Sequence, residues 1–171
     1  MSVTLMRHTR PDVASGVCYG RTDYDVASSF DDEFQQVLAS IEPFDVLISS
    51  PLLRCRRLAD AIGANFNREP IIDVRVQEMD FGTWEELAWS KIDVAELDQW
   101  ADDFHHARPH GGESVAMLSA RVREALGEFR ASGKKHMVVT HSGVIRVAMA
   151  RDQLPASFDY AVDYGGSVLL S

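Results

Sequence analysis

The sequence has few cysteines, fewer positive than negative charges, and no long apolar run. Cys18 and Cys55 are the two cysteines among 171 residues, and neither belongs to a C-x-x-C pair or to another ligand pattern. A zinc site or a disulfide framework therefore has little support, and both thiols are expected to be buried or incidental. No run approaches the ~20 apolar residues of a membrane span, and no signal-peptide pattern follows Met1. A cytoplasmic protein without membrane contact is therefore expected.

Positive charge is scarce as well. Lysine and arginine number 17 against 26 aspartates and glutamates, which gives a formal net charge of −9 at pH 7. Nucleic acids and anionic membranes attract clustered lysine and arginine, so neither is an expected partner. A small molecule is the better prediction, and an anionic one would need its cationic partners gathered locally. The oligomeric state is unknown from the sequence.

The chain does contain enough apolar material for one buried core. Hydrophobic residues make up 46% and charged residues 25% of a length that favours one domain. Short apolar runs predict strands over 3–6, 44–48, 136–140 and 167–170. Apolar residues at helical spacing predict helices over 30–41, 52–62, 114–129 and 144–150. The alternation predicts an α/β fold, a three-layer α/β/α sandwich with a largely parallel central sheet, formed by residues 1–171 as a single domain.

The segment 81–112 breaks this alternation. It holds all three tryptophans, Trp84, Trp89 and Trp100, together with three of the six histidines and a helical pattern. We expect a helical insertion that covers the site. Its tryptophans either pack in a core of their own or, with Tyr19, present flat apolar surface to a substrate that carries an aromatic base.

Arginines and histidines follow three of the predicted strands. The first strand ends at Arg7 and His8, Arg54 comes soon after the second, and His141 follows the third. Because the carboxyl ends of parallel strands converge, these four residues are expected to meet in one pocket. The cluster has no carboxylate ligands for a metal, whereas guanidinium groups pair with phosphate through two hydrogen bonds. The sequence therefore predicts a phosphate site without a metal or another cofactor.

A predicted helix start strengthens this interpretation. Ser142 and Gly143 open a helix directly after His141, and the free N–H groups of a helix start favour an anion. Each signal alone is weak, because a histidine at a strand end is more often structural and an arginine on a helix is more often solvated. Their joint occurrence is much less expected by chance.

Five segments resemble the signature of the histidine phosphatase superfamily, also called phosphoglycerate mutase-like. In chain order, L-x-R-H-G, S-x-L-x-R, L-x-E-x-x-x-G-x-x-E, G-E-S and V-x-H-x-G-x-x-R are matched by residues 5–9, 50–54, 77–85, 112–114 and 139–146. The resemblance covers nearly the whole chain. It implies the phosphoglycerate mutase-like fold and a phosphatase that works through a phosphorylated histidine.

The resemblance implies a role for each residue of the cluster. His8 is the implied nucleophile, and it would attack as a neutral imidazole whose pKa the cations of Arg7 and Arg54 help to lower. Arg7, Arg54, His141 and the N–H of Gly143 would stabilise the phosphoryl group during its transfer.

Glu78 is the implied proton donor to the leaving alcohol, and it would then take a proton from the attacking water. Without the resemblance, Glu78 would be taken for a surface carboxylate, and Asp80 is the alternative acid. Glu113 is expected to order the helix that begins near Ser114 or to pair with an arginine.

Two positions depart from the family pattern. Thr9 replaces the usual glycine, so the backbone there should avoid positive φ, and its hydroxyl either faces the phosphate or packs. Ala14 replaces an asparagine that commonly follows the nucleophile by six residues. One phosphate donor is therefore missing or supplied by Thr9, Arg10 or Tyr19.

The segments 18–23 and 81–85, with Trp89, look like the α-ribazole phosphatase branch of cobalamin synthesis. The expected substrate is therefore α-ribazole 5′-phosphate, and a broad-specificity sugar or nucleotide phosphatase is the nearest alternative. A phosphoglycerate mutase is less expected, because the mutases of this family have longer chains with added segments around the site. A noncatalytic phosphate-binding scaffold is also less expected, because it would not need His8 or Glu78.

Overall fold

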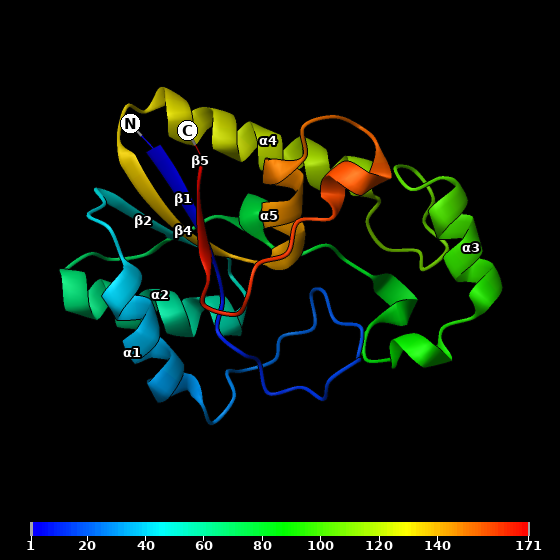
Figure 1. Ribbon diagram of the computed structural model, residues 1–171, viewed down its shortest axis with the longest axis horizontal. Helices are drawn as coiled ribbons and strands as arrows, with labels where there is room; N and C mark the ends of the chain where they lie inside the picture. The colour runs from blue at the N-terminus through cyan, green and yellow to red at the C-terminus, as the bar shows by residue number, and fades with distance from the viewer. Residues whose placement is uncertain (1, 171) are drawn as a thin grey trace.

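The computed structural model describes residues 2–170, and a five-stranded sheet forms its centre (Figure 1). The strands are β1 (Ser2–Arg7), β2 (Val46–Ser49), β3 (Ile71–Ile72), β4 (Lys135–Thr140) and β5 (Ser167–Leu170). Their order across the sheet is β3-β2-β4-β1-β5. The strand β5 runs antiparallel to β1, whereas the other neighbouring strands are parallel.

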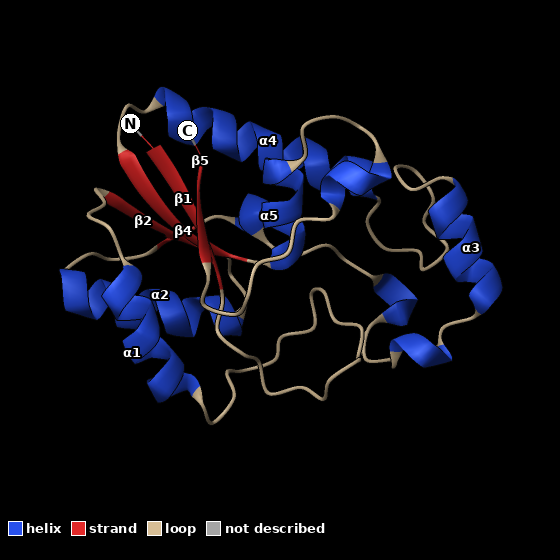
Figure 2. Ribbon diagram, in the orientation of Figure 1, coloured by secondary structure: helices blue, strands red, loops and turns tan. Residues whose placement is uncertain are grey.

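Helices cover both faces of the sheet (Figure 2). One layer contains α1 (Phe30–Ser40) and α2 (Leu53–Phe66), and the other contains α4 (Val115–Ala131) and α5 (Ser142–Met149). Alternate side chains of the central strands point to opposite layers, and each large aliphatic side chain that is fully buried contributes about 1.5–3 kcal/mol. Within residues 2–170, no helix is both long enough and apolar enough to cross a membrane.

The predicted α/β sandwich with a largely parallel sheet is confirmed. The observed strand and helix limits lie within a few residues of the predicted ones. The sequence analysis did not predict β3, because its two residues are both exposed and too few to show any periodicity. The description of residues 1–171 as one domain stays a prediction.

The segment 81–112 extends to one side of the sheet, where its short 3₁₀ turns and the helix α3 (Val94–Asp102) are drawn in green (Figure 1). It is joined to the first long loop by an antiparallel bridge between Val17 and Ala88. Trp84 is 1% exposed and lies in a small core, but Trp89 is 39% exposed. Of the two alternatives for the tryptophans, a core position therefore holds for Trp84, whereas Trp89 is accessible.

Candidate active site

Three predicted site residues meet at the carboxyl edge of the sheet. His8 directly follows β1, and its backbone N–H donates to the carbonyl of Thr140 at the end of β4 (3.0 Å). His141 follows Thr140, and the centroids of its ring and the His8 ring are 5.2 Å apart. Arg54 lies in the first turn of α2, with its Nε 3.3 Å from His8 Nε2. The parallel strands therefore place residues far apart in the sequence around one imidazole.

The hydrogen bonds of His8 define its tautomer. His8 Nδ1 lies 2.7 Å from the carbonyl oxygen of Thr9, which can only accept, so Nδ1 carries the proton. The unprotonated Nε2 then accepts from Arg54. The side chain is 2% exposed, and burial lowers the pKa of His8 well below its ordinary value, with a further contribution from Arg54. Burial therefore lowers the pKa of His8 more than do the charges of Arg7 and Arg54, which were the causes named from the sequence. The ring therefore presents a neutral Nε2 whose lone pair faces Arg54 Nε.

Arg54 is fully buried and is fixed by carbonyl groups of the first loop. Its two terminal nitrogens donate to the carbonyls of Gly20 (2.7 Å) and Thr22 (2.9 Å). Glu85 in turn accepts from the N–H groups of Arg21 (2.8 Å) and Thr22 (2.6 Å). The carboxylate of Glu85 therefore holds the loop that holds the guanidinium.

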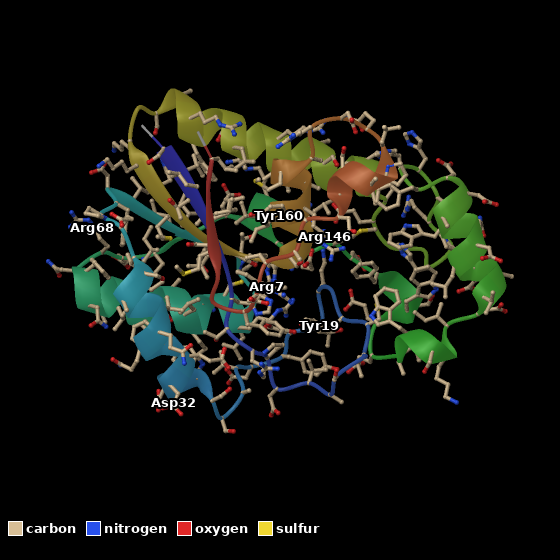
Figure 3. All side chains as sticks on the ribbon, viewed as in Figure 1. Arg7, Tyr19, Asp32, Arg68, Arg146 and Tyr160 are labelled. Carbon is tan, nitrogen blue, oxygen red and sulfur yellow. The ribbon has the colours of Figure 1, made fainter. Side chains whose placement is uncertain are left out.

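Arg7, which is labelled in Figure 3, precedes His8 and has its guanidinium carbon 3.9 Å from the ring centroid of Tyr164. Its Nη1 donates to the carbonyl of Val162 (2.8 Å). Arg7 Nε and the hydroxyl of Thr9 are buried and have no hydrogen-bond partner in the protein. The backbone at Thr9 has no positive φ, as expected. Buried donors are normally hydrogen-bonded, so these two groups favour a ligand whose oxygens can accept from them.

Tyr164 is a site residue that the sequence analysis missed. Its ring centroid lies 5.7 Å from that of His8, and its hydroxyl is 3.0 Å from the hydroxyl of Tyr19. The antiparallel return of β5 places it there, because the N–H of Arg7 donates to the carbonyl of Gly166 (2.9 Å). No sequence motif marks Tyr164, and its position could have been predicted only from the pairing of β5 with β1.

His141 is completely buried and shares its surroundings with two small polar side chains. Its Nε2 lies 2.7 Å from the hydroxyl of Ser50 and 3.4 Å from the sulfur of Cys55. Burial lowers the pKa of His141 well below its ordinary value, and the charge of Arg54 adds to the effect. Burial also raises the pKa of the Cys55 thiol. Both groups are therefore neutral near pH 7, and Cys55 is a buried thiol as expected.

Glu78 lies beside the start of α5. Its Oε2 accepts from the N–H of Gly143 (3.1 Å), and its Oε1 accepts from the N–H of Met79 (2.9 Å). A Cβ at position 143 would collide with Oε1, so this approach requires glycine. The N–H predicted to bind phosphate thus donates to the carboxylate of Glu78. Phosphate binding by Gly143 stays a prediction.

Arg121 of α4 fixes the segment that carries Glu78. It donates to the carbonyls of Arg75 (2.8 Å), Gln77 (2.7 Å) and Glu78 (3.0 Å). The same guanidinium makes two hydrogen bonds to the Glu113 carboxylate, at 2.7 and 2.8 Å. The expected pairing of Glu113 with an arginine is therefore confirmed, and Arg121 was missed.

Three further observations concern Asp80, the possible metal ligands and Ala14. The side chain of Asp80 is 35% exposed and lies 3.7 Å from the guanidinium of Arg21. Within residues 2–170, no group of three or more histidine, cysteine, aspartate or glutamate side chains is arranged to hold a metal ion. Ala14 contributes no polar side chain, and it lines a cavity together with Arg7 and Tyr19. The chemistry of this site is therefore that of guanidinium, imidazole and one carboxylate.

Known proteins share both the sequence pattern and the fold. Residues 3–161 match the model of the histidine phosphatase superfamily (branch 1). The glucosyl-3-phosphoglycerate phosphatase of Mycobacterium tuberculosis is 28% identical over 161 residues, covering 77% of this chain and 71% of that protein. The adenosylcobalamin/α-ribazole phosphatase of Salmonella typhimurium is 27% identical over 114 residues, covering 64% and 56%.

A solved structure extends the likeness to the whole described fold. The α-ribazole phosphatase of Shigella flexneri superposes with a TM-score of 0.86 at 21% identity, covering 100% of this chain and 90% of that one. At this identity the likeness concerns the fold alone. The family match rests on the sequence, and the relatives that share it are phosphatases. The chain therefore belongs to branch 1 of the histidine phosphatase superfamily and is a phosphatase.

Proposed function

We propose that the protein hydrolyses phosphomonoesters through a phosphohistidine formed at His8. In the first step, the lone pair of His8 Nε2 attacks phosphorus and the bond from phosphorus to the ester oxygen breaks. Glu78 transfers a proton to that oxygen, so the product leaves as a neutral alcohol. Arg7 and Arg54 pair with the oxygens of the transferring phosphoryl group, and His141 lies beside them.

The second step returns the enzyme to its starting state. A water molecule gives a proton to the carboxylate of Glu78 and attacks phosphorus, and the bond between phosphorus and Nε2 breaks. Its electrons return to Nε2, inorganic phosphate leaves, and Glu78 is again protonated. The hydrogen bonds from Gly143 and Met79 hold the carboxylate in one place through both steps.

The environment of His8 carries this proposal. Its Nδ1 is bound to the Thr9 carbonyl and its Nε2 faces Arg54, so the imidazole is held in the tautomer that a nucleophile requires. Beside it, Arg7 Nε and the Thr9 hydroxyl are buried donors without a partner in the protein. Phosphoryl oxygens bound at His8 would accept from both. Thr9 would then supply the donor that Ala14 lacks.

The substrate we propose is α-ribazole 5′-phosphate, the ester that the α-ribazole phosphatase branch hydrolyses in cobalamin synthesis. Support comes from the resemblance of residues 18–23 and 81–85 to that branch and from the Salmonella relative. A sugar phosphatase is the second candidate, because the mycobacterial glucosyl-3-phosphoglycerate phosphatase aligns over more of the chain. A panel of α-ribazole 5′-phosphate, glucosyl-3-phosphoglycerate, ribose 5-phosphate and nucleoside monophosphates separates the two candidate functions by kcat/KM.

Trapping the intermediate tests the chemistry independently of the substrate. Wild-type protein is mixed with a phosphate-labelled aryl ester in EDTA and quenched within one turnover. We expect label on the protein, none on His8→Ala, and normal labelling of His106→Ala, which removes an exposed histidine. Label on His8→Ala, or a requirement for a divalent ion, would contradict the proposal.

A further inference from the structure

A cleft opens beside the phosphate end of the site. It has a volume of about 310 Å³ and is bordered by Arg7, by Tyr19 and by Tyr164. The remaining walls come from Arg10, Pro11, Val13, Ala14, Ser15, Gly16, Val17 and Trp89. Because Arg7 directly precedes His8 and the ring of Tyr164 lies 5.7 Å from that of His8, the cleft adjoins the position proposed for the transferring phosphoryl group. A leaving group attached to that phosphate can therefore occupy it.

Trp89 is the flat apolar surface in this cleft. The backbone N–H of Trp89 donates to the carbonyl of Gly16 (2.9 Å), which joins the segment 81–112 to the first loop. Phe81 and Trp84 contact its ring in edge-to-face arrangements, with centroids 5.8 and 6.2 Å away. These contacts fix the ring from behind, yet 39% of the residue is exposed. The indole is therefore both rigid and accessible, which is what stacking on a planar ligand requires.

A second cavity borders the site on the side of Gly143, and its size excludes it as the main pocket for a nucleoside-like group. It has a volume of about 100 Å³. Pockets that enclose drug-sized ligands typically have volumes of about 300–1,000 Å³. The cleft at Trp89 falls within this range and the cavity at Gly143 does not.

The cleft also carries a planar cation. The guanidinium carbon of Arg10 lies 5.2 Å from the ring centroid of Tyr164, and the side chain is 62% exposed. Guanidinium groups stack on aromatic faces, so Arg10 and Trp89 offer two kinds of surface to one flat ring. A small sugar phosphate has no ring system that could use them.

We propose that Trp89 determines specificity by stacking on the heteroaromatic base of the leaving group, with residues 81–112 acting as an insertion that covers the site. This inference rests on the proposed phosphomonoesterase function and adds the group that recognises the ester. The substrate class is a sugar phosphate that carries an aromatic base.

Two variants and one matched control test the role of Trp89. Trp89→Ala should lower kcat/KM for α-ribazole 5′-phosphate roughly two- to tenfold, the range expected for one aromatic contact. Trp89→Phe should retain most of the rate. Neither variant should change kcat/KM for ribose 5-phosphate. Leu87→Ala removes an apolar side chain of the same segment that is 42% exposed, and it should leave both rates unchanged.

Other outcomes would overturn the proposal. Equal losses on both esters would make Trp89 a structural residue, and no loss on either would place the base elsewhere. Wild-type protein that hydrolyses α-ribazole 5′-phosphate no better than ribose 5-phosphate would also reject stacking. In each case, labelling of His8 by the aryl ester still reports whether the phosphohistidine chemistry is intact, so the two proposals fail separately.

Discussion

At the scale of single residues, the site places two neutral imidazole rings next to cations. The rings of His8 and His141 are buried beside Arg54, and both the burial and the guanidinium charge disfavour a protonated imidazole there. Protonation is therefore disfavoured, and the lone pair of His8 Nε2 stays available below the pH at which an ordinary histidine takes up a proton.

The acid limb of the pH profile should show this directly. Because the pKa of His8 is lowered, the neutral nucleophile persists as pH falls below the ordinary value of about 6.5, and the rate declines only at the lowered pKa. We expect the midpoint of kcat/KM for p-nitrophenyl phosphate below pH 6.5, after correction for titration of the substrate. A midpoint at or above that pH would show that burial does not control His8.

Glu78 should matter in proportion to the basicity of the leaving group. Glu78→Gln keeps the size of the side chain but removes the transferable proton, and general acid catalysis is worth about 10²–10⁴-fold. We expect a loss of that order in kcat/KM on an alkyl phosphate and a much smaller loss in kcat/KM on p-nitrophenyl phosphate, whose leaving oxygen needs no proton. Hydrolysis of the phosphohistidine is common to both esters and limits kcat rather than kcat/KM, so equal losses in kcat/KM would remove Glu78 from the acid role.

The sequence predicts the residues that directly follow strands better than the residues whose positions depend on contacts between distant segments. Arg7, His8 and His141 were placed together because parallel strands end at one edge. Tyr164 was missed because its position depends on the antiparallel pairing of β5, which short apolar runs do not reveal. The bond between Gly143 and Glu78 was missed for a similar reason, since two distant backbone segments must approach before it exists.

At the scale of elements, the helix α4 supports Glu78, the proposed proton donor, from a distance. Its first turn is capped by the hydroxyl of Ser114, which accepts from the N–H of Met117 (3.2 Å). From the same helix, Arg121 reaches the carbonyls that precede and include Glu78, and Glu113 neutralises its charge. The packing of α4 on the sheet and the position of the acid are thus connected through one guanidinium.

Removing that guanidinium should affect stability and proton transfer together. Arg121→Met leaves the mostly buried Glu113 carboxylate with only the longer contact to Arg21 (3.7 Å). Breaking a fully buried pair costs roughly 3–5 kcal/mol, so a loss of about 2–4 kcal/mol is expected for the free energy of unfolding. Among molecules that remain folded, kcat/KM should fall more for alkyl than for aryl phosphates. Urea denaturation and steady-state kinetics measure the two effects.

Arg123→Met is the matched control for this prediction. It removes a second arginine from the same helix, two positions further along, that makes no bond to the Glu78 segment. We expect little change in either measurement. An equal loss of kcat/KM on both classes of ester in Arg121→Met would assign Arg121 a purely structural role.

The elements themselves were predictable to different degrees. Strands buried on both faces consist of continuous apolar residues, so β1 and β4 stand out in the sequence. The edge strand β3 has exposed isoleucines and no such pattern. The turns and α3 within residues 81–112 were expected as helical, but which tryptophan would face solvent depends on how the segment packs against the first loop.

At the scale of the whole molecule, the buried neutral histidines make stability depend on pH. His8 and His141 have lowered pKa values in the folded protein, so the unfolded chain binds protons first as pH falls. Their contribution is complete above about pH 6.5 and is lost as pH falls from there toward the folded-state pKa values. Acid should therefore destabilise the fold before the carboxylates titrate.

Between pH 7 and pH 5.5, these two histidines should reduce the free energy of unfolding by up to about 2.5 kcal/mol. Urea denaturation at the two pH values measures the change. The double variant His8→Asn with His141→Asn should lose much less stability over the same interval. A decline as steep as that of the wild type would assign the acid sensitivity to other groups.

The antiparallel return of β5 also sets when the site can form during synthesis. The hydrogen bond from Arg7 to Val162 joins residues 155 positions apart in the chain. At about 5–20 residues per second, a ribosome needs roughly 8–30 s to make the intervening segment. Throughout that interval the nucleophile has been translated, but Tyr164 and the carbonyl that orients Arg7 have not. A nascent chain in which β5 has not yet emerged therefore lacks the contacts that hold Arg7, and we expect it to gain activity only after β5 has paired with β1.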